Sequence, residues 1–180
     1  GAWGTALAIH LGKLHPTKLW ARDSGHVSGM KKAQSNPLYL GDFKFPPLLE
    51  ISDDFIATLS DVDLIVCAVP TSGFREILKS IKEINQSATV IWANKGLEQG
   101  SAKLPHEIAF EELGDPKKTK RHWGVVSGPS FAAELVRSLP TALTLASTSK
   151  ETAMLAANIF HHHNLRVYTS QDVIGVSVGG

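Results

Sequence analysis

The sequence has a single cysteine, Cys67, and no apolar run of the length that a membrane helix requires. One thiol cannot form an internal disulfide. Its place in the apolar run 64–69 predicts a buried side chain that packs as a small hydrophobe. A transmembrane helix needs about 20 consecutive apolar residues, so we expect no membrane span. Nothing in this composition calls for an oxidising compartment.

The sequence also lacks an excess of positive or negative charge. The 18 Lys and Arg residues nearly balance 17 Asp and Glu residues, for a net charge of +1. A nucleic-acid-binding domain typically carries a strong positive excess, so we expect no nucleic-acid partner. With 180 residues, 43% of them hydrophobic, the chain can form one globular domain with a sizeable core, and we assign residues 1–180 to it.

Metal-ligand spacing is absent as well, although His161-His162-His163 superficially resembles a cluster. Three consecutive helical side chains point in different directions, so they cannot readily share one ion. A position just after a predicted helix instead suits cations, which the helix dipole favours there. We therefore expect these histidines to be structural or solvated, and we expect no metal site.

What is present is an alternation of strand and helix patterns. Continuous apolar runs such as 63–69 and 88–93 are typical of buried parallel strands. Predicted strands occupy 18–21, 48–52, 63–69, 88–93, 123–127, 140–146 and 165–169, and predicted helices 5–14, 24–35, 55–59, 72–84, 103–113, 131–137 and 150–160. This order predicts an α/β fold with a doubly wound, mostly parallel Rossmann-type sheet.

The chain opens with Gly1-Ala2-Trp3-Gly4, which matches the second half of the dinucleotide fingerprint G-x-G-x-x-G. In that interpretation Gly1 lets a pyrophosphate approach the backbone and Gly4 lets the helix pack closely on the sheet. The first glycine and its strand would precede Gly1, so we expect a fold truncated at the first strand. Taken alone, half a fingerprint is a weak signal, and an ordinary helix start explains it better.

Ligands of such sheets bind beyond the carboxyl ends of the strands, where polar segments follow several predicted strands here. Arg22 follows strand 18–21, and a guanidinium there suits a 2′-phosphate, which favours NADP over NAD. Its neighbour Asp23 fits either a ribose contact or a helix cap. Lys95 follows strand 88–93 and could neutralise a phosphate or polarise a carbonyl. After strand 63–69, Thr71 and Ser72 offer a helix cap.

The segment Ser127-Gly128-Pro129-Ser130 joins strand 123–127 to helix 131–137. We expect Ser130 to be the N-cap of that helix, because serine oxygens accept bonds from free helical N–H groups. Gly128 would let the backbone approach a ligand closely. The free amides of the helix start make this turn a candidate anion site, although an ordinary strand-to-helix connection has the same pattern.

Together these segments resemble the bacterial type of NAD(P)-dependent glycerol-3-phosphate dehydrogenases. The resemblance rests on Gly-Ala-Trp-Gly-Thr-Ala-Leu-Ala, Leu-Trp-Ala-Arg-Asp, Ala-Val-Pro, Asn-Lys-Gly-Leu-Glu, Ser-Gly-Pro-Ser-Phe-Ala, Pro-Thr-Ala-Leu-Thr-Leu-Ala-Ser, Arg-Val-Tyr-Thr-Ser and Asp-Val-Ile-Gly-Val, in this order along the whole chain. It implies a cytoplasmic oxidoreductase that uses NADP or NAD, acts on a small phosphate substrate and feeds glycerophospholipid synthesis. A homodimer is left open. A helical C-terminal domain that completes the site would be absent from this chain.

The resemblance also assigns residues. It implies substrate contacts at Lys95, Gly128 and Ser130, and cofactor contacts in the segment Gly1–Gly4 and at Ala2, Trp3, Arg22, Lys95 and Ala132. Tyr39 would border the adenosine. The catalytic lysine of the family is expected just after Gly180, so we expect no catalytic residue in this chain.

Two departures from the family pattern stand out. Ala2 replaces a more usual serine, so a backbone N–H must serve there, and Ser177-Val178 replaces a more usual polar residue and leucine. Two other interpretations stay open. One is a related 2-hydroxyacid or ketopantoate-type dehydrogenase, and the other is a non-catalytic dinucleotide-binding module.

Overall fold

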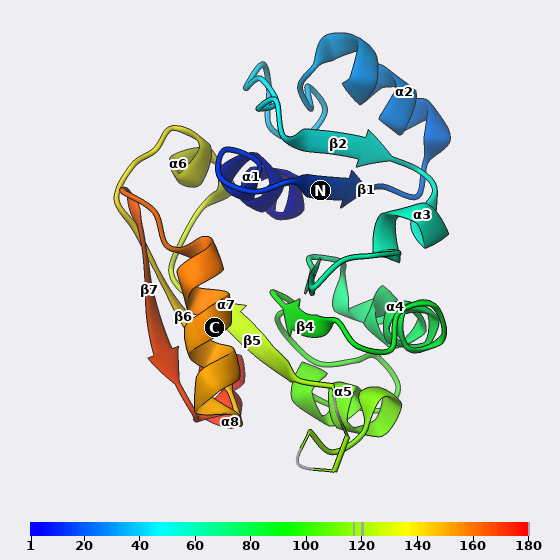
Figure 1. Cartoon of the computed structure of the whole chain (residues 1–180), viewed down its shortest axis with the longest axis vertical. Helices are drawn as coiled ribbons and strands as arrows, with labels where there is room; N and C mark the ends of the chain where they lie inside the picture. Colours follow the sequence, from blue (N-terminus) through cyan, green and yellow to red (C-terminus); the bar gives the residue numbers. More distant parts are fainter. Residues whose placement is uncertain (117, 120, 180) are drawn as a thin grey trace. The chain divides into compact units, whose positions relative to one another are not determined.

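The alternation of helices and strands predicted from the sequence is confirmed in the computed structural model, which describes residues 1–116, 118–119 and 121–179. The helices are α1 (Ala2–Leu11), α2 (Ser24–Ala33), α3 (Phe55–Leu59), α4 (Thr71–Ile84), α5 (Pro105–Leu113), α6 (Ala132–Val136), α7 (Lys150–Phe160) and α8 (Val173–Val178). The strands are β1 (Thr17–Trp20), β2 (Leu49–Ser52), β3 (Leu64–Cys67), β4 (Thr89–Trp92), β5 (Trp123–Ser127), β6 (Thr141–Ser147) and β7 (Leu165–Ser170) (Figure 1).

The chain divides into two compact units, and the first comprises residues 1–58, 130–141 and 162–165. Here β1 and β2 form a parallel two-stranded sheet, with Thr17 opposite Leu49 and Trp20 opposite Ser52. The apolar core beside this sheet combines helix α2 with both strands and contains Val27, Met30, Ile51, Leu19, Ala21, Phe45 and Leu49. Helix α6 packs against α1 within the same unit.

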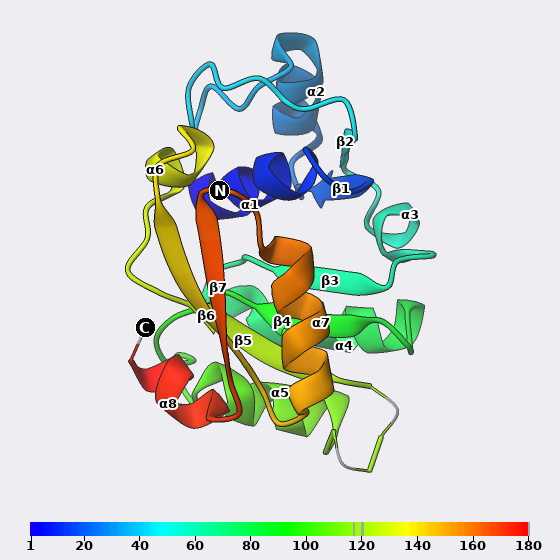
Figure 2. The same ribbon diagram turned by 60° about the vertical axis from the view of Figure 1, so that its left-hand side comes forward.

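The second unit, built from residues 59–129, 142–161 and the described residues from 166 onward, holds a five-stranded sheet in the order β3-β4-β5-β6-β7. Strands β3, β4 and β5 are parallel to one another. Trp92 of β4 is fully buried, and its ring lies 5.8 Å from that of Phe74 and 5.6 Å from that of Trp123. Figure 2 shows α7 in front of this sheet.

One pairing departs from a uniformly parallel sheet, because β6 runs antiparallel to β5, with Gly124 opposite Ser147 and Ser127 opposite Thr144. A parallel return would need a crossover of a dozen or more residues, usually a helix that covers the sheet. The connection after β5, residues 128–140, is long enough for a crossover, but its helix is the five-residue α6, which belongs to the first unit. Strand β6 then pairs with β5 in the antiparallel direction.

Helix α8 is absent from the predicted helices. It begins after Asp172, whose carboxylate accepts a hydrogen bond of 2.8 Å from the N–H of Gly175. Within the second unit it packs against β5 and α5. None of the helices in the described part of the chain is long and apolar enough to cross a membrane.

Candidate functional site

The residues predicted from the half fingerprint form the start of α1. Gly1 is the N-cap of this ten-residue helix and provides no side-chain cap, so the first amides keep the free donors that every helix N-terminus has. Thr5, which is 1% exposed, holds the turn from inside: its hydroxyl donates to the Gly1 carbonyl at 3.0 Å and accepts from Asn36 Nδ2 at 2.8 Å. The segment Gly1–Gly4 can therefore present N–H groups to an anion.

Arg22 lies in the same unit, just after β1, and its side chain is exposed. It forms no hydrogen bond or ion pair with any residue that the structure describes. Asp23 has a structural role, because it is the N-cap of α2 and accepts a bond of 2.5 Å from the N–H of His26. The helix-cap alternative for Asp23 is thus the one that the structure supports. Tyr39 lies edge-on to His26, with ring centroids 5.5 Å apart.

The expected cap of α6 was wrong by one residue. Phe131, in an extended conformation, is the N-cap, and its carbonyl accepts from the N–H groups of Glu134 and Leu135. The helix therefore starts at Ala132, whereas a helix capped by Ser130 would start at Phe131. Ser130 and Ala132 belong to the first unit, with Gly1–Gly4 and Arg22, whereas Lys95 and Gly128 belong to the second.

In the second unit, the chain beyond β4 places Lys95 beside Gly128. The Lys95 ammonium lies 3.4 Å from the Gly128 carbonyl oxygen, a long contact, and most of its side chain is exposed. Its backbone is fixed more tightly, because the Thr71 hydroxyl donates to the Lys95 carbonyl at 2.7 Å. The preceding residue is held too, since Asn94 Nδ2 donates to the Val69 carbonyl at 2.8 Å.

The position of Thr71 had suggested that it caps its own helix, but it does not. The N-cap of α4 is Pro70, which has no side-chain donor or acceptor to offer. The hydroxyl of Thr71 instead reaches across to the end of the neighbouring strand. Sequence reasoning missed this contact because it joins residues 24 positions apart.

Gly128 has a packing reason to be glycine that the sequence had not shown. An added Cβ would lie 2.7 Å from the Ala142 carbonyl oxygen and 3.1 Å from Leu143 Cδ2. The space is filled by β6, so glycine is required here by the close approach of two strands. The backbone carbonyl of Gly128 remains beside Lys95, and its contact with a substrate stays a prediction.

Buried polar atoms at the same strand ends were not anticipated. Asn94 and Ser127 are 7% and 8% exposed, and Asn94 Oδ1 and Ser127 Oγ have no hydrogen-bond partner among the described residues. Asn94 follows β4, and Ser127 is the last residue of β5, the strand that pairs with β4. Because buried polar atoms are nearly always paired, these two mark a place for a water or a polar ligand group.

Cys67 is 4% exposed, as predicted, and burial raises the pKa of its thiol to about 12. The thiolate needed for nucleophilic chemistry is thereby disfavoured.

Helix α7 ends at Phe160, with His161 as its C-cap. Across the described ranges no group of three or more His, Cys, Asp or Glu residues is arranged to hold a metal ion.

Comparison with known proteins places this geometry in a family. Residues 1–153 match the family model described as the NAD-dependent glycerol-3-phosphate dehydrogenase N-terminus. The chain belongs to this family. It is 55% identical over 180 residues to a glycerol-3-phosphate dehydrogenase [NAD(P)+] of Methylobacillus flagellatus, and 45% identical over 184 residues to one of Nitrosococcus oceani. In each comparison all of the chain is covered.

A solved structure of a glycerol-3-phosphate dehydrogenase from Coxiella burnetii is similar over 98% of the chain, with a TM-score of 0.90 and 36% identity. The match covers 53% of that protein, and the Methylobacillus match covers 54% of its relative. The chain thus spans about half the length of the relatives it matches. The similarity confirms the α/β Rossmann-like fold with its mainly parallel sheet and the resemblance seen in the sequence.

Proposed function

We propose that the full-length protein transfers a hydride between NAD(P)H and dihydroxyacetone phosphate or sn-glycerol 3-phosphate, and so supplies glycerophospholipid synthesis. Residues 1–180 would form its cofactor-binding part. Family membership supports this proposal, and one observation carries it. Lys95, exposed at the end of buried strand β4, has its backbone fixed by Thr71 and its ammonium directed to the carbonyl of Gly128.

For the cofactor, we propose that the amides of Gly1–Gly4 receive the pyrophosphate and that Arg22 receives the 2′-phosphate of NADP. The free donors of a helix N-terminus fit a pyrophosphate, and an exposed guanidinium that no described residue engages fits a second phosphate. Ala2, Trp3 and Ala132 would also contact the cofactor, and Tyr39 would border the adenosine. When bound, the cofactor supplies the hydride chemistry.

For the substrate, we propose that Lys95 holds a phosphate or carbonyl oxygen and that Gly128 and Ser130 orient the molecule. A preorganised ammonium is most effective where negative charge develops in the transition state. The unpaired atoms of Asn94 and Ser127 support a polar ligand at the strand ends. A lysine beyond Gly180 would exchange the alcohol proton.

Steady-state kinetics of the full-length protein test the proposal. Lys95→Ala should lower kcat/KM for dihydroxyacetone phosphate by about a hundredfold, the usual loss of ~2.7 kcal/mol when one stabilising group is removed. Lys95→Arg should rescue only partly, because a planar guanidinium differs from a compact ammonium. Lys82→Ala is a matched control, since Lys82 is an exposed lysine of α4 in the same unit.

The same assay separates the other interpretations. Faster turnover of ketopantoate or another 2-oxoacid would indicate a related dehydrogenase, and cofactor binding without turnover would indicate a non-catalytic module. Near-normal kcat/KM in Lys95→Ala would leave this lysine as a solvated strand end. We extend the proposal to a homodimer in the cytoplasm, which light scattering of the full-length protein and cell fractionation test.

A further inference from the structure

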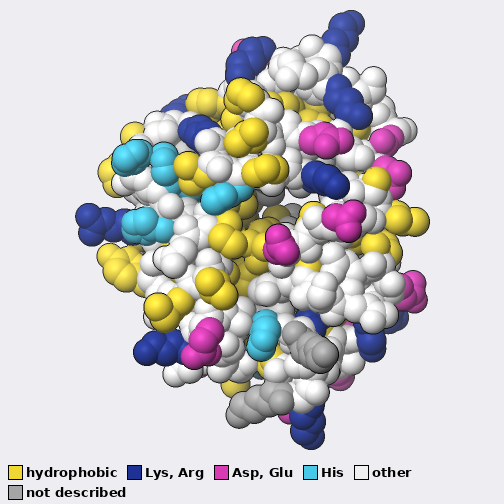
Figure 3. All heavy atoms as spheres, in the orientation of Figure 1, with side chains coloured by type: hydrophobic (Ala, Val, Ile, Leu, Met, Phe, Trp, Pro, Cys, Tyr) yellow, Lys and Arg dark blue, Asp and Glu magenta, His cyan; other side chains and the backbone are white. Residues whose placement is uncertain are grey.

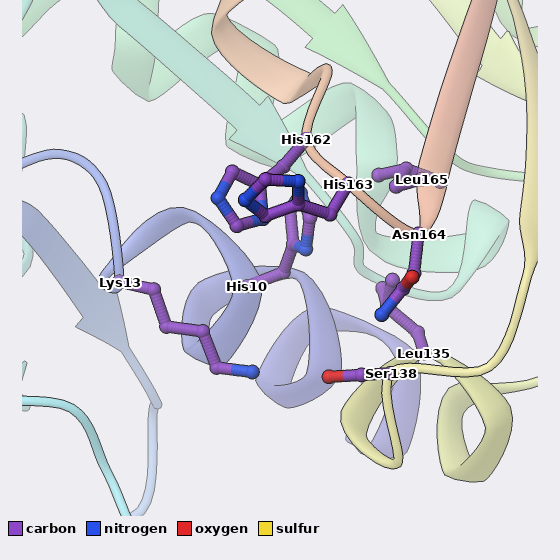
Figure 4. Close-up of a pocket in the computed structure, with 8 residues that line it drawn as sticks. All are labelled: His10, Lys13, Leu135, Ser138, His162, His163, Asn164 and Leu165. Carbon is purple, nitrogen blue, oxygen red and sulfur yellow. The ribbon is translucent and has the colours of Figure 1, made fainter.

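A cavity of about 180 Å³ lies within the first unit, on residues that the proposed reaction does not use. Three segments of the chain line it: the end of α1, the end of α6 and the turn that leads into β7. The lining residues are His10, Lys13, Leu135, Ser138, His162, His163, Asn164 and Leu165. The volume is about six times the share of one water molecule in the liquid, which is enough for a small tetrahedral anion. Figure 4 shows Lys13 and Ser138 pointing toward one another across it, with the two neighbouring histidine rings above.

Every polar side chain that lines this cavity can donate a hydrogen bond. Lysine and asparagine supply N–H groups, serine supplies an O–H group, and even a neutral imidazole donates through one ring nitrogen. No aspartate or glutamate stands among the lining residues, all of which the structure describes. Leu135 and Leu165, both buried, also line it. A space whose polar side chains can all donate, which includes a lysine and no carboxylate, matches an oxyanion better than a cation.

The histidine and asparagine donors are held in place by backbone geometry. His162 and Leu165 form a tight turn closed by two hydrogen bonds, of 3.1 and 2.7 Å, with His163 and Asn164 at its tip. The Asn164 carbonyl accepts a further bond of 2.7 Å from the Thr141 N–H. The ring of His162 lies 4.3 Å from that of His163 and 6.0 Å from that of His10. In Figure 3, histidine side chains gather in one region of the face shown.

Ser138 carries its hydroxyl in a backbone conformation that residues with a side chain rarely adopt. It follows α6 at φ +58°, in the left-handed region, and its N–H bonds to the Leu135 carbonyl while the Leu139 N–H bonds to that of Glu134. This is the Schellman arrangement, in which the left-handed position is usually glycine. A serine there is strained relative to glycine, and such strain gathers at functional sites. The hydroxyl that it retains lines the cavity.

We propose that this cavity binds a phosphate-class oxyanion, held by Lys13, Ser138, His163 and Asn164. The competing explanation is that Lys13 and His10 only compensate the negative end of the α1 dipole. That role needs neither the turn at 162–165 nor a serine in a left-handed conformation. None of these residues belongs to the cofactor or substrate set, so the site is separate from the proposed reaction.

Binding of inorganic phosphate to the full-length protein tests this proposal. Titrations at constant ionic strength, followed by the side-chain NMR signals of the histidines, should show saturable shifts at the cavity. They should persist in Lys95→Ala, which removes a phosphate contact at the proposed substrate residues. Lys13→Met should weaken phosphate binding about tenfold, and Lys31→Met, an exposed lysine of α2 in the same unit, less than twofold.

Ser138→Gly separates a ligand role from a structural one. It should raise the melting temperature by relieving strain and should weaken phosphate binding several-fold. Methyl phosphate distinguishes the source of the group: equal affinity would indicate the phosphate of a small metabolite, and loss of binding would indicate free phosphate. Shifts that do not saturate, or equal affinity in wild type, Lys13→Met and Lys31→Met, would overturn the proposal.

Discussion

The hydroxyl of Thr71 donates to the backbone carbonyl of Lys95 at 2.7 Å, and this bond ties the start of α4 to the end of β4. A second bond, from Asn94 to the Val69 carbonyl, runs between the same two segments. Immediately afterwards Gly96 takes a φ of +83°, which lets the chain turn away from the strand. The backbone that carries the proposed substrate lysine is thus fixed by neighbours on both sides.

Removing the Thr71 hydroxyl should therefore impair catalysis without a direct substrate contact. Thr71→Val keeps the shape but loses the bond, which is worth about 1 kcal/mol net, and we expect kcat/KM to fall about fivefold or more. Thr71→Ser should restore most of it. Kinetics on both variants, with melting temperatures as the folding control, give the answer. If the valine variant matches wild type, Thr71 does not position Lys95.

Arg22 should discriminate between the two cofactors. Its exposed guanidinium suits a 2′-phosphate. Arg22→Ala should therefore weaken NADPH binding about ten- to a hundredfold, because a charge-assisted contact is worth ~1.5–3 kcal/mol. The binding of NADH should change much less. Fluorescence titration of both cofactors measures this, with Arg166→Ala as an exposed arginine control. Equal weakening of both cofactors would show that Arg22 does not read the 2′-phosphate.

A cluster of charges just beyond Lys95 predicts an acid-dependent contribution to stability. The guanidinium of Arg75 donates two bonds to Glu98, of 2.9 and 2.8 Å, and further bonds to Glu111 and Glu112. Arg75, and secondarily Ser101, hold the pKa of Glu98 down to about 2. A carboxylate with a lowered pKa stabilises the fold fully above its unfolded pKa, and this contribution is lost as the pH falls toward the folded value.

Glu98→Gln should therefore lower the unfolding free energy at pH 7, and the difference from wild type should shrink between about pH 4.3 and the folded pKa near 2. Urea unfolding at pH 7, 5 and 3 measures the trend. Glu83→Gln, an exposed glutamate of α4, should show little difference at any of these values. A difference between Glu98→Gln and wild type that stays constant with pH would exclude this linkage.

The sequence predicted local features well and long-range ones poorly. The buried runs of β3, β4 and β5 were recognisable because continuous apolar stretches are typical of parallel strands. The antiparallel direction of β6 was not predicted, because no local pattern encodes the direction in which a strand returns to the sheet. Phe131 became the cap in place of Ser130 because the extended backbone runs one residue further, and cap rules weigh side chains alone.

Site prediction shows the same division between local and long-range information. Residue types at strand ends identified Arg22 and Lys95 as exposed cations. The bond from Thr71 to the Lys95 carbonyl and the donors around Ser138 join positions far apart in the chain. Only the folded arrangement could reveal them.

Gly128 gives the sharpest test of a structural role at a proposed binding residue. A Cβ there would lie 2.7 Å from the Ala142 carbonyl oxygen and 3.3 Å from Leu143 Cα, and both are backbone atoms that cannot rotate away. Gly128→Ala should therefore reduce the unfolding free energy by about 1–3 kcal/mol, the usual effect of overpacking, whether or not substrate is present. Denaturant unfolding of the ligand-free protein measures it.

Gly73→Ala provides the matched control, because a Cβ at this position of α4 meets nothing within 4 Å. Alanine is a better helix former than glycine by about 0.5–1 kcal/mol, so this variant should be as stable as wild type or more so. Opposite signs for the two glycine-to-alanine changes would establish that Gly128 is required by the approach of β6. Should Gly128→Ala instead keep full stability and lose only substrate affinity, the strands must separate easily, and the glycine would serve the ligand alone.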